Sequence, residues 1–366
     1  MRMAVLDRRR HTVRSKRALS TGVRGNCSAV LRCSYLSVIP FGRDRLGARP
    51  LGSAVFRQRL RLALVGMRSC SLLLLTALGA GALAGCQSAQ SSPSSAVAID
   101  SIVQRGTLRA VVVGSALPYL EKSGDGYQGL GVTVLEAIRA EIQEAYDPKE
   151  GRLKLEPIPV VSVSEGLEKL RSGQADIACG VVFNWEREKT FDYTIPFAQS
   201  GVRVLAPEGN NGTPEALAGQ VVGVVQDSVA AQKLNALAPE ASYKVFADPA
   251  AALAALQSGA IKILGGDTLW LRGNQEAVAP KSSLVPAIPY GKAGMGCLTA
   301  ESSPKLRNFS NIAIGRLMQR YLDGDAATLK SINQWVGPGS AVNLPSELIA
   351  NYYRMVLSTT AGFEKS

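Results

Sequence analysis

The stretch Leu170 to Pro207, LRSGQADIACGVVFNWEREKTFDYTIPFAQSGVRVLAP, decides the fold of this chain. A helix ends at Gly173, because glycine commonly ends helices. A short apolar strand from Asp176 to Gly180 follows, and a polar turn covers Asn184 to Lys189. A second strand begins at Val202. The pattern predicts a strand whose carboxyl end opens into a polar loop.

That loop is a candidate binding site. Ligands of open α/β sheets bind outside the carboxyl ends of the strands. Arg187 lies directly after such a strand, where its planar fork of donors can bind an anionic group. The alternative is that Arg187 belongs to a solvated run of charges from Glu186 to Lys189.

The motifs of this stretch resemble those of the family 3 extracellular solute-binding proteins, the receptors of polar amino acid ABC importers. In that family a helix ending in Leu-x-x-Gly-x-x-Asp leads to a strand, a Glu-Arg pair and an Asp-aromatic-Ser/Thr motif. The matching residues here are Leu170, Gly173, Asp176, Glu186-Arg187 and Asp192-Tyr193-Thr194. Cys179-Gly180 with Asn184 most resembles the glutamate/aspartate-binding branch. The resemblance runs from about Gly106 to the C-terminus.

The charge of the chain is concentrated at its beginning. Residues 1–66 contain 15 Lys and Arg but 2 Asp and Glu, whereas the remaining 26 basic and 27 acidic residues nearly cancel. We therefore expect no nucleic-acid binding, which needs a basic surface on the folded part. The basic extension 1–66 is interpreted as upstream sequence translated from a start codon placed too early. The alternatives are a disordered basic arm and a transit-like peptide.

Residues 67–85 resemble a bacterial lipoprotein signal peptide. Met67 and Arg68 precede an apolar run that is short for a membrane span, and Leu83-Ala84-Gly85 lead to Cys86. The resemblance implies cleavage before Cys86, lipidation of its thiol and a periplasmic, membrane-anchored protein. Residues 86–98 are predicted to be a Ser/Ala-rich tether. The alternative for the apolar run is a buried helix.

Cysteine and histidine usage limits the chemistry of the folded part. After Cys27, Cys33, Cys70 and Cys86, only Cys179 and Cys297 remain, which in an exported protein are most simply a disulfide, or else two buried thiols. The resemblance implies the disulfide. The single histidine, His11, lies in the extension, which excludes His-based catalysis and His-ligated metals in the mature protein. We expect no metal and no cofactor, since Gly265-Gly266 precede an acid rather than the Lys-Ser/Thr of a phosphate-binding loop.

Strands and helices alternate along the folded part, which predicts a parallel α/β sheet with right-handed crossovers. The expected strands are 107–113, 153–161, 176–180, 202–205, 219–225, 243–246 and 261–264. The expected helices are 131–144, 164–171, 228–237, 249–257, one beginning at 268, and 304–322. The resemblance implies a periplasmic-binding-protein-like (type II) fold of two lobes, each with a central mainly parallel sheet, joined by a two-segment hinge. Lobe 1 is predicted to be 99–205 plus 293–366, and lobe 2 to be 206–292.

An α-amino acid presents a carboxylate and an ammonium, so its site needs a donor fork and a counter-charge. The resemblance implies that Arg187 binds the α-carboxylate and Asp267 the α-ammonium, from opposite lobes. It also implies roles for the Gly180 carbonyl and for backbone N–H groups at Val182, Ser228 and Val229. Tyr119 is predicted either to line the cleft or to pack. Asp267 alternatively serves as the cap of the helix that begins at Thr268.

Several positions depart from the family pattern. Val181-Val182 replace a hydroxyl residue, Val163 replaces an aromatic, and no arginine lies in residues 112–115. Asp227 replaces a small residue near the expected carboxylate site. These departures favour a neutral or cationic amino acid over glutamate or aspartate.

The leading hypothesis is a monomeric, lipid-anchored receptor, not an enzyme, that hands an amino acid to the permease of an ABC importer. A second hypothesis is an enzyme similar to the cyclohexadienyl dehydratases, which would need a general acid beside the carboxylate-binding arginine. The acids considered for that role are Asp227 and Asp267. Release of product from prephenate or arogenate distinguishes the two. A third hypothesis is a ligand-sensing module of a membrane kinase, which needs a second hydrophobic span or a signalling domain.

Overall fold

The structure is a computed structural model, and it describes residues 99–146 and 152–359. These residues belong to one compact unit. The basic extension, the signal peptide, the tether and the lipidation site at Cys86 therefore lie outside the described residues. In this part of the chain, none of the helices is both long enough and apolar enough to span a membrane.

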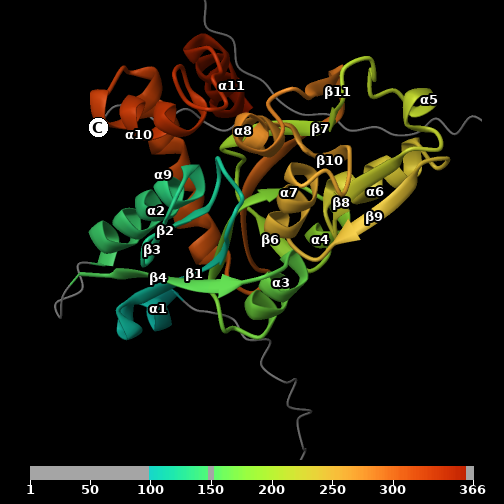
Figure 1. The fold of residues 1–366 in the computed structure, drawn as a ribbon. Helices are drawn as coiled ribbons and strands as arrows, with labels where there is room; N and C mark the ends of the chain where they lie inside the picture. Colours follow the sequence, from blue (N-terminus) through green and yellow to red (C-terminus); the bar gives the residue numbers. More distant parts are fainter. Residues whose placement is uncertain (1–98, 147–151, 360–366) are drawn as a thin grey trace, which may run out of the picture. The chain divides into compact units, whose positions relative to one another are not determined.

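The described strands form a mixed nine-stranded sheet in the order β4-β1-β5-β11-β7-β10-β8-β9, with β6 paired to β11 (Figure 1). Its strands are β1 (Thr107–Val113), β4 (Lys154–Val160), β5 (Ile177–Val182), β6 (Phe191–Tyr193), β7 (Ala198–Ala206), β8 (Val221–Val225), β9 (Ser242–Phe246), β10 (Ile263–Asp267) and β11 (Ser283–Ala300). A separate hairpin consists of β2 (Glu121–Ser123) and β3 (Gly126–Gln128).

Two parallel sets of strands lie at the two ends of the sheet. Strands β4, β1 and β5 form one set, here named the β1 half, and β10, β8 and β9 form the other, the β8 half. Strands β7 and β11 lie between the halves and are antiparallel to their neighbours. The expected parallel arrangement is confirmed within each half, but the two halves share one continuous sheet. The lobe boundaries at residues 205 and 293 stay a prediction.

Strand β11 is 18 residues long, so it can pair with β7 along its first part and with β5 of the β1 half along its last part. Its first part pairs with β7 from Ser283 onward, and its last part pairs with β5 up to Thr299. Sequence analysis missed this strand, since prolines and glycines are unfavourable inside strands. The structure accommodates them where the pairing with β7 shifts register, between Val285 and Lys292.

Most helices begin and end where the sequence indicated. They are α1 (Ile99–Arg105), α2 (Leu130–Tyr146), α3 (Val163–Arg171), α4 (Trp185–Glu188), α5 (Pro214–Leu217), α6 (Val229–Leu237), α7 (Pro249–Gln257), α8 (Thr268–Val278), α9 (Pro304–Leu322), α10 (Ala326–Val336) and α11 (Ser346–Thr359). Side-chain caps fix several starts: Ser162, Ser228, Asp248 and Asp267 each accept a hydrogen bond from a backbone N–H of the first turn. The polar turn expected over 184–189 is instead the short helix α4, capped by Asn184.

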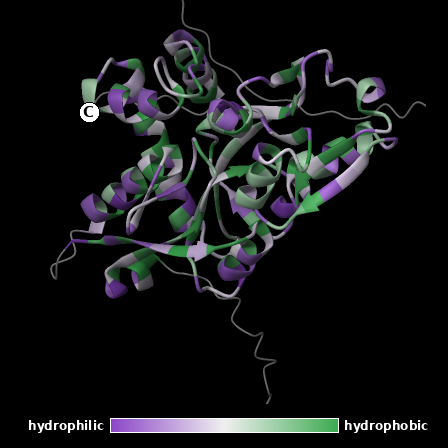
Figure 2. Cartoon of the chain, viewed as in Figure 1, coloured by the Kyte–Doolittle hydropathy of each residue, from purple (hydrophilic) through white to green (hydrophobic). Residues whose placement is uncertain are grey.

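Apolar side chains of the sheet and of the helix faces form the core. Figure 2 shows hydrophobic residues along the central strands and hydrophilic residues on the outer faces of many helices. Helix α2 illustrates the pattern, because Leu135, Ile138 and Ile142 are buried at helical spacing. Burial of such side chains contributes roughly 25 cal/mol per Å² of apolar surface.

The Gly and the Asp of the helix-ending motif have structural roles. Gly173 adopts φ +70° at the end of α3, a conformation that other residues rarely adopt. Asp176 is fully buried and forms ion pairs with Arg105 at 2.6 Å and Arg109 at 2.7 Å. It also accepts a hydrogen bond from the Arg109 backbone N–H at 2.8 Å. The motif thereby ties β5 to α1 and β1.

The Asp-Tyr-Thr motif also contributes to the fold. Asp192 pairs with Arg307 of α9 at 3.1 Å. The hydroxyl of Thr194 accepts a hydrogen bond from the Cys297 backbone N–H at 2.9 Å. The structure joins Cys297 to Cys179 by a disulfide, as expected, and this bond ties β11 to β5 across 118 residues of sequence.

Replacing both cysteines by alanine should lower the free energy of unfolding by about 2–5 kcal/mol, because the disulfide restricts the unfolded chain. Urea denaturation of wild type and of Cys179→Ala/Cys297→Ala measures the difference. Reductant should lower the free energy of unfolding of the wild type to that of the variant and leave the value of the variant unchanged. Equal unfolding midpoints for all samples would show that the bond makes no contribution.

Candidate functional site

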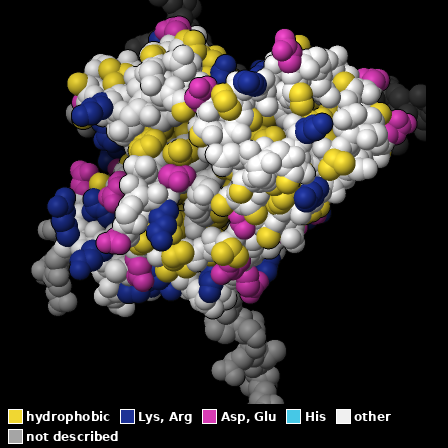
Figure 3. Space-filling view, in the orientation of Figure 1, with side chains coloured by type: hydrophobic (Ala, Val, Ile, Leu, Met, Phe, Trp, Pro, Cys, Tyr) yellow, Lys and Arg dark blue, Asp and Glu magenta, His cyan; other side chains and the backbone are white. Residues whose placement is uncertain are grey.

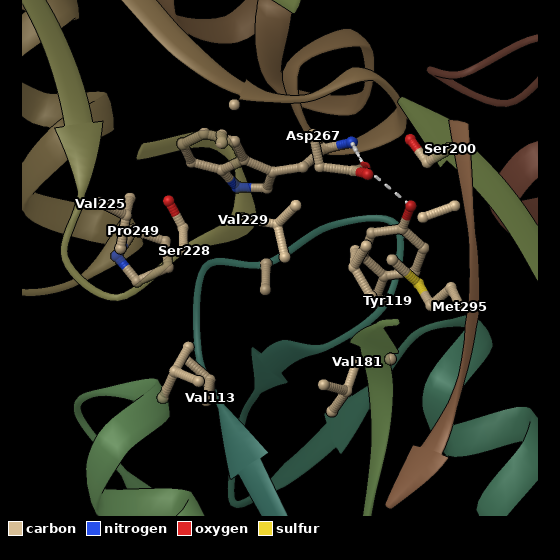
Figure 4. A pocket seen from close by; sticks show the side chains of 18 of the residues that line it. Val113, Tyr119, Val181, Ser200, Val225, Ser228, Val229, Pro249, Asp267 and Met295 are labelled. Carbon is tan, nitrogen blue, oxygen red and sulfur yellow. Dashed lines mark hydrogen bonds between the residues drawn. The ribbon is translucent and has the colours of Figure 1, made fainter. Parts of the chain in front are cut away.

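A cavity of about 210 Å³ lies between the β1 half and the β8 half, and strands β7 and β11 form part of its wall. All seven residues that the sequence predicted for the site line this cavity: Tyr119, Gly180, Val182, Arg187, Ser228, Val229 and Asp267. Figure 4 shows Asp267, Tyr119 and Ser200 close together at one end, with valine side chains around the remaining space. The tertiary structure therefore collects residues that are up to 148 positions apart in sequence.

Asp267 ends β10 and caps α8. Its Oδ1 accepts hydrogen bonds from the backbone N–H groups of Leu269 at 3.0 Å and Trp270 at 3.1 Å. The same oxygen accepts a third hydrogen bond, at 2.8 Å, from the hydroxyl of Tyr119 in the β1 half (Figure 4). The two alternatives for Asp267 are thus compatible, since the residue caps the helix and also lines the cavity.

Burial raises the pKa of the Asp267 carboxyl above its usual range, and hydrogen bonds from Ser200, Trp270 and Tyr119 offset part of this effect. An ionised Asp267 in this place is destabilised by the loss of water. A cation in the cavity would restore the lost stabilisation, which makes this carboxylate a suitable partner for an ammonium group.

Tyr119 is both part of the core and part of the cavity wall, which answers the question that the sequence left open. Its ring is buried, and burial together with the nearby Asp267 raises its pKa well above the usual value for tyrosine. Gly180 allows the ring to approach the backbone of β5, because a Cβ at this position would lie 3.3 Å from the Tyr119 Cβ. Gly180 also has φ +86°, a conformation that favours glycine.

Arg187 extends from α4 into the space between the halves. Its Nη2 donates to the carbonyl oxygen of Asp227 at 2.9 Å, and its Nη1 donates to the carbonyl oxygen of Val182 at 3.4 Å. The hydroxyl of Tyr193 donates to the same Val182 carbonyl at 3.0 Å. Burial raises the pKa of Tyr193, and the charge of Arg187 lowers it in part. These contacts orient the guanidinium and leave other N–H donors for an anion.

The start of α6 borders the cavity from the β8 half. The side chain of Ser228 caps this helix by accepting a hydrogen bond from the Ala231 N–H at 3.0 Å. Val229 is the first helical residue. The N-terminus of a helix favours a negative charge, which fits the predicted role of this segment beside Arg187.

Further hydrogen bonds join the two halves. Asn184 donates to the side chain of Gln232 at 2.9 Å, Trp270 Nε1 donates to the Ser115 carbonyl at 3.1 Å, and the hydroxyl of Ser164 donates to the Asp227 carboxylate. Asp227, which has φ +56°, therefore contacts the β1 half through both its side chain and its carbonyl.

Sequence analysis missed several lining residues, namely Ser200, Lys233, Trp270, Tyr290 and Lys292. Trp270 had a usable signal, since it lies three residues after Asp267 and so faces the same side of α8. Lys292 and Tyr290 had none, because they belong to β11, the strand that the sequence did not reveal. Lys233 is an exposed residue of α6 at the rim.

Two further features of the described residues bear on metal and nucleic-acid binding. Within the described ranges, no group of three or more His, Cys, Asp or Glu side chains is arranged to hold a metal ion. On the face shown in Figure 3, Lys and Arg side chains are interspersed with Asp and Glu side chains. That face has no continuous basic field of the kind that binds nucleic acid.

Comparison with known proteins agrees with this architecture. A profile of the bacterial extracellular solute-binding proteins, family 3, matches residues 108–336. Among curated proteins, the virulence sensor protein BvgS of Bordetella pertussis (strain Tohama I) is 29% identical over 109 residues, which are 29% of this chain. The match spans 9% of the length of that relative.

Solved structures share the fold at low sequence identity. The ancestral amino acid-binding protein AncCDT-1, a precursor of cyclohexadienyl dehydratase, is 21% identical with a TM-score of 0.55, covering 65% of this chain and 98% of its own. The substrate-binding protein AbpA of Streptococcus pneumoniae Canada MDR_19A, bound to L-arginine, is 21% identical with a TM-score of 0.54, covering 64% and 99%. An ancestral arginine-binding protein bound to glutamine is 22% identical with a TM-score of 0.55, covering 64% and 99%. These likenesses confirm the expected type II periplasmic-binding-protein-like fold.

Asp267→Ala should lower the free energy of unfolding by about 2 kcal/mol or more, because it removes the cap of α8 and leaves the Tyr119 hydroxyl without its acceptor. Asp267→Asn should lower the free energy of unfolding by less than about 0.5 kcal/mol, since asparagine caps helices equally well. Its side-chain carbonyl can also accept the hydrogen bond from Tyr119.

Chemical denaturation of both variants tests this dual role. Asp325→Ala is the matched control, because Asp325 caps α10 through the Thr328 N–H at 2.8 Å and does not line the cavity. Its free energy of unfolding should fall by the amount that loss of a helix cap alone causes, about 0.5–2 kcal/mol. Equal losses for Asp267→Ala and Asp325→Ala would rule out a stabilising contribution from the Tyr119 contact.

Proposed function

Because the chain belongs to the bacterial extracellular solute-binding proteins, family 3, we propose that it binds a free amino acid in the cavity between the two halves of the sheet. The observation that supports this most is that Arg187 and Asp267, one guanidinium and one carboxylate, come from opposite halves and line the same cavity. This is the charge pair that a zwitterionic head group requires.

Each anchor has a defined task in the proposal. Arg187 binds the α-carboxylate with the N–H groups that Val182 and Asp227 do not occupy, assisted by backbone N–H groups at Val182, Ser228 and Val229. Asp267 binds the α-ammonium together with the carbonyl of Gly180. Tyr119 orients the Asp267 carboxylate by its hydrogen bond of 2.8 Å. An amino acid so bound bridges the β1 and β8 halves, which favours a closed arrangement about β7 and β11.

The cellular role follows from the family and from the N-terminal sequence. We propose that the protein works outside the cytoplasm as a monomer, delivers its ligand to the permease of an ABC importer and needs no cofactor. Cys86 is the proposed lipidation site that anchors it to the membrane. The amino acids bound by AbpA and by the ancestral arginine-binding protein support an amino acid as the ligand.

Catalysis is a weaker hypothesis for this cavity. A dehydratase needs an acid free to protonate a leaving group. Asp267 is the one acidic residue among the described residues that line the cavity, and it is held by three hydrogen bonds. Asp227 bonds to Ser164 outside the lining. Incubation with prephenate or arogenate should give no product, and product formation would favour the enzyme over the receptor.

A sensory role has one specific observation in its favour, the partial match to a virulence sensor protein. A receptor for import and a receptor for signalling bind their ligands by the same chemistry, so the cavity does not separate them. Deletion of the gene separates them: loss of amino acid uptake supports the importer, whereas normal uptake with altered gene regulation supports the sensor.

Arg187→Ala should weaken amino acid binding by roughly 30-fold to several thousandfold, because removing one partner of a desolvated charge pair costs on the order of 2–5 kcal/mol. Isothermal titration calorimetry measures the change. The control is Lys189→Ala, two residues away, because Lys189 is exposed and pairs with the exposed Glu186 at 2.8 Å. It should bind like the wild type. Unchanged binding by Arg187→Ala would refute the proposed anchor.

Amino acid affinity should fall as the pH is lowered from neutral toward the raised pKa of Asp267. Burial raises the pKa of Asp267, so the carboxyl takes up a proton above the usual aspartate range and then no longer attracts the ammonium. Because the pKa of Asp267 is higher in the folded than in the unfolded chain, protonation of this carboxyl adds to the free energy of unfolding at low pH. That contribution is lost as the pH rises through the folded-state pKa.

Calorimetry across this pH range compares the wild type with Asp267→Asn, which has no titrating carboxyl at the site. The variant should bind weakly and show a much flatter pH profile. Parallel profiles for the two proteins would assign the pH dependence to another group.

A further inference from the structure

We propose that the preferred substrate is an amino acid with an uncharged, apolar side chain of medium size, such as leucine, isoleucine, valine, methionine or phenylalanine. This inference rests on the proposed function, because it takes Arg187 and Asp267 as the anchors of the head group. It restricts the expected substrates from neutral or cationic amino acids to apolar ones.

The wall of the cavity beyond the two anchors is aliphatic on both sides. The β1 half contributes Val113, Val163, Leu167 and Val181. The β8 half contributes Val225 and Pro249. Figure 4 shows Val113 and Val181 below the space and Val225 and Pro249 beside it. A side chain that leaves the head group therefore meets hydrocarbon, whose burial is favourable for an apolar group and unfavourable for a polar one.

The charges that line the cavity exclude a cationic substrate side chain. Among the described lining residues, Asp267 is the sole acid and is assigned to the ammonium, whereas Arg187, Lys233 and Lys292 are basic. The side chain of lysine or arginine would bring a further positive charge without a partner. An unpaired charge removed from water is strongly disfavoured.

An acidic side chain is also disfavoured. Arg187 is assigned to the α-carboxylate, and both Lys233 and Lys292 are exposed residues whose charges water screens. Asp227 lies near the start of α6 and adds a negative charge beside the expected carboxylate site. A second substrate carboxylate would thus lie against valines without a buried cationic partner.

Most neutral polar side chains of the wall make a hydrogen bond within the protein. Ser162 and Ser228 accept hydrogen bonds as helix caps, and Tyr119 donates to Asp267. Trp270 donates to the Ser115 carbonyl, and Tyr290 donates to the Gly212 carbonyl. Each of these hydroxyls keeps a further donor or acceptor site, but the aliphatic wall around them gives a side-chain amide fewer partners than water does.

The cavity is large enough for a side chain of medium size. Its 210 Å³ exceeds the roughly 150 Å³ of an apolar cavity that holds benzene. The space therefore holds a head group together with a side chain of aliphatic or single-ring size.

The test is calorimetric titration of the purified protein with leucine, isoleucine, valine, methionine, phenylalanine, glutamine, glutamate, lysine and arginine. The apolar members should bind roughly 30-fold or more tightly than the charged ones, because an uncompensated charge costs on the order of 2–5 kcal/mol. Tightest binding of lysine, arginine, glutamate or glutamine would overturn this inference and leave the proposed function standing. Binding of none of the nine would overturn the proposed function itself.

Val163→Asp provides a second, independent measurement. The first residue of a helix tolerates an acid well, and Val163 opens α3 directly after its cap. A carboxylate here gives a cationic side chain its partner, so the affinity ratio of lysine to leucine should rise about tenfold or more.

Val161→Asp is the matched control, since Val161 lies two residues earlier, is 69% exposed and does not line the cavity. Its ligand preference should equal that of the wild type. Thermal unfolding of both variants verifies that each is folded. An unchanged lysine to leucine ratio in a folded Val163→Asp would show that the substrate side chain does not point toward this wall.

Discussion

The hydrogen bond between the Tyr119 hydroxyl and Asp267 Oδ1 is the contact on which the site depends. It joins the β1 half to the β8 half at the point where β10 ends and α8 begins. The same oxygen holds two backbone N–H groups of α8, so the position of the helix and the position of the carboxylate are fixed together. Loss of this oxygen affects the fold and the cavity at once.

Strands β7 and β11 supply the second constraint. Strand β11 pairs with β5 of the β1 half, β7 pairs with β10 of the β8 half, and the two strands pair with each other, all in antiparallel fashion. Hydrogen-bonded pairing makes this junction continuous, while the register shifts in β11 and its glycines and prolines interrupt regular pairing there. The junction thus holds the two halves together by main-chain contacts close to the cavity, where Ser200, Lys292 and Met295 also form its wall.

The charged and the aliphatic residues that line the cavity have separate roles in the proposed binding. The ends of α6, α8 and β5 bring polar and charged groups to the head-group region, because strand and helix termini expose unpaired backbone groups. The valines come from the carboxyl ends of β1, β5 and β8 and from the first turn of α3. The proposed amino acid specificity follows from this division, since recognition of the head group and accommodation of the side chain use separate surfaces.

The elements themselves were largely predictable from local sequence. The strand at Thr107–Val113 and the helices Pro249–Gln257 and Pro304–Leu322 have the expected limits, because β-branched runs, capping residues and helix-ending glycines act over a few residues. Helices α10 and α11, in contrast, were not predicted from the sequence, and the turn after Asn184 is helical.

The amino-acid sequence alone indicated most of the strands and helices, the two cysteines of the disulfide and seven residues that line the cavity. Only the tertiary structure decided that β11 continues through its prolines, that the two halves share one sheet, and that Lys233, Trp270 and Lys292 border the same cavity. The physical reason is the sequence separation of the interacting residues. Caps, turns and apolar periodicity depend on neighbours in sequence. Strand pairing and the charge balance of a cavity depend on residues more than a hundred positions apart.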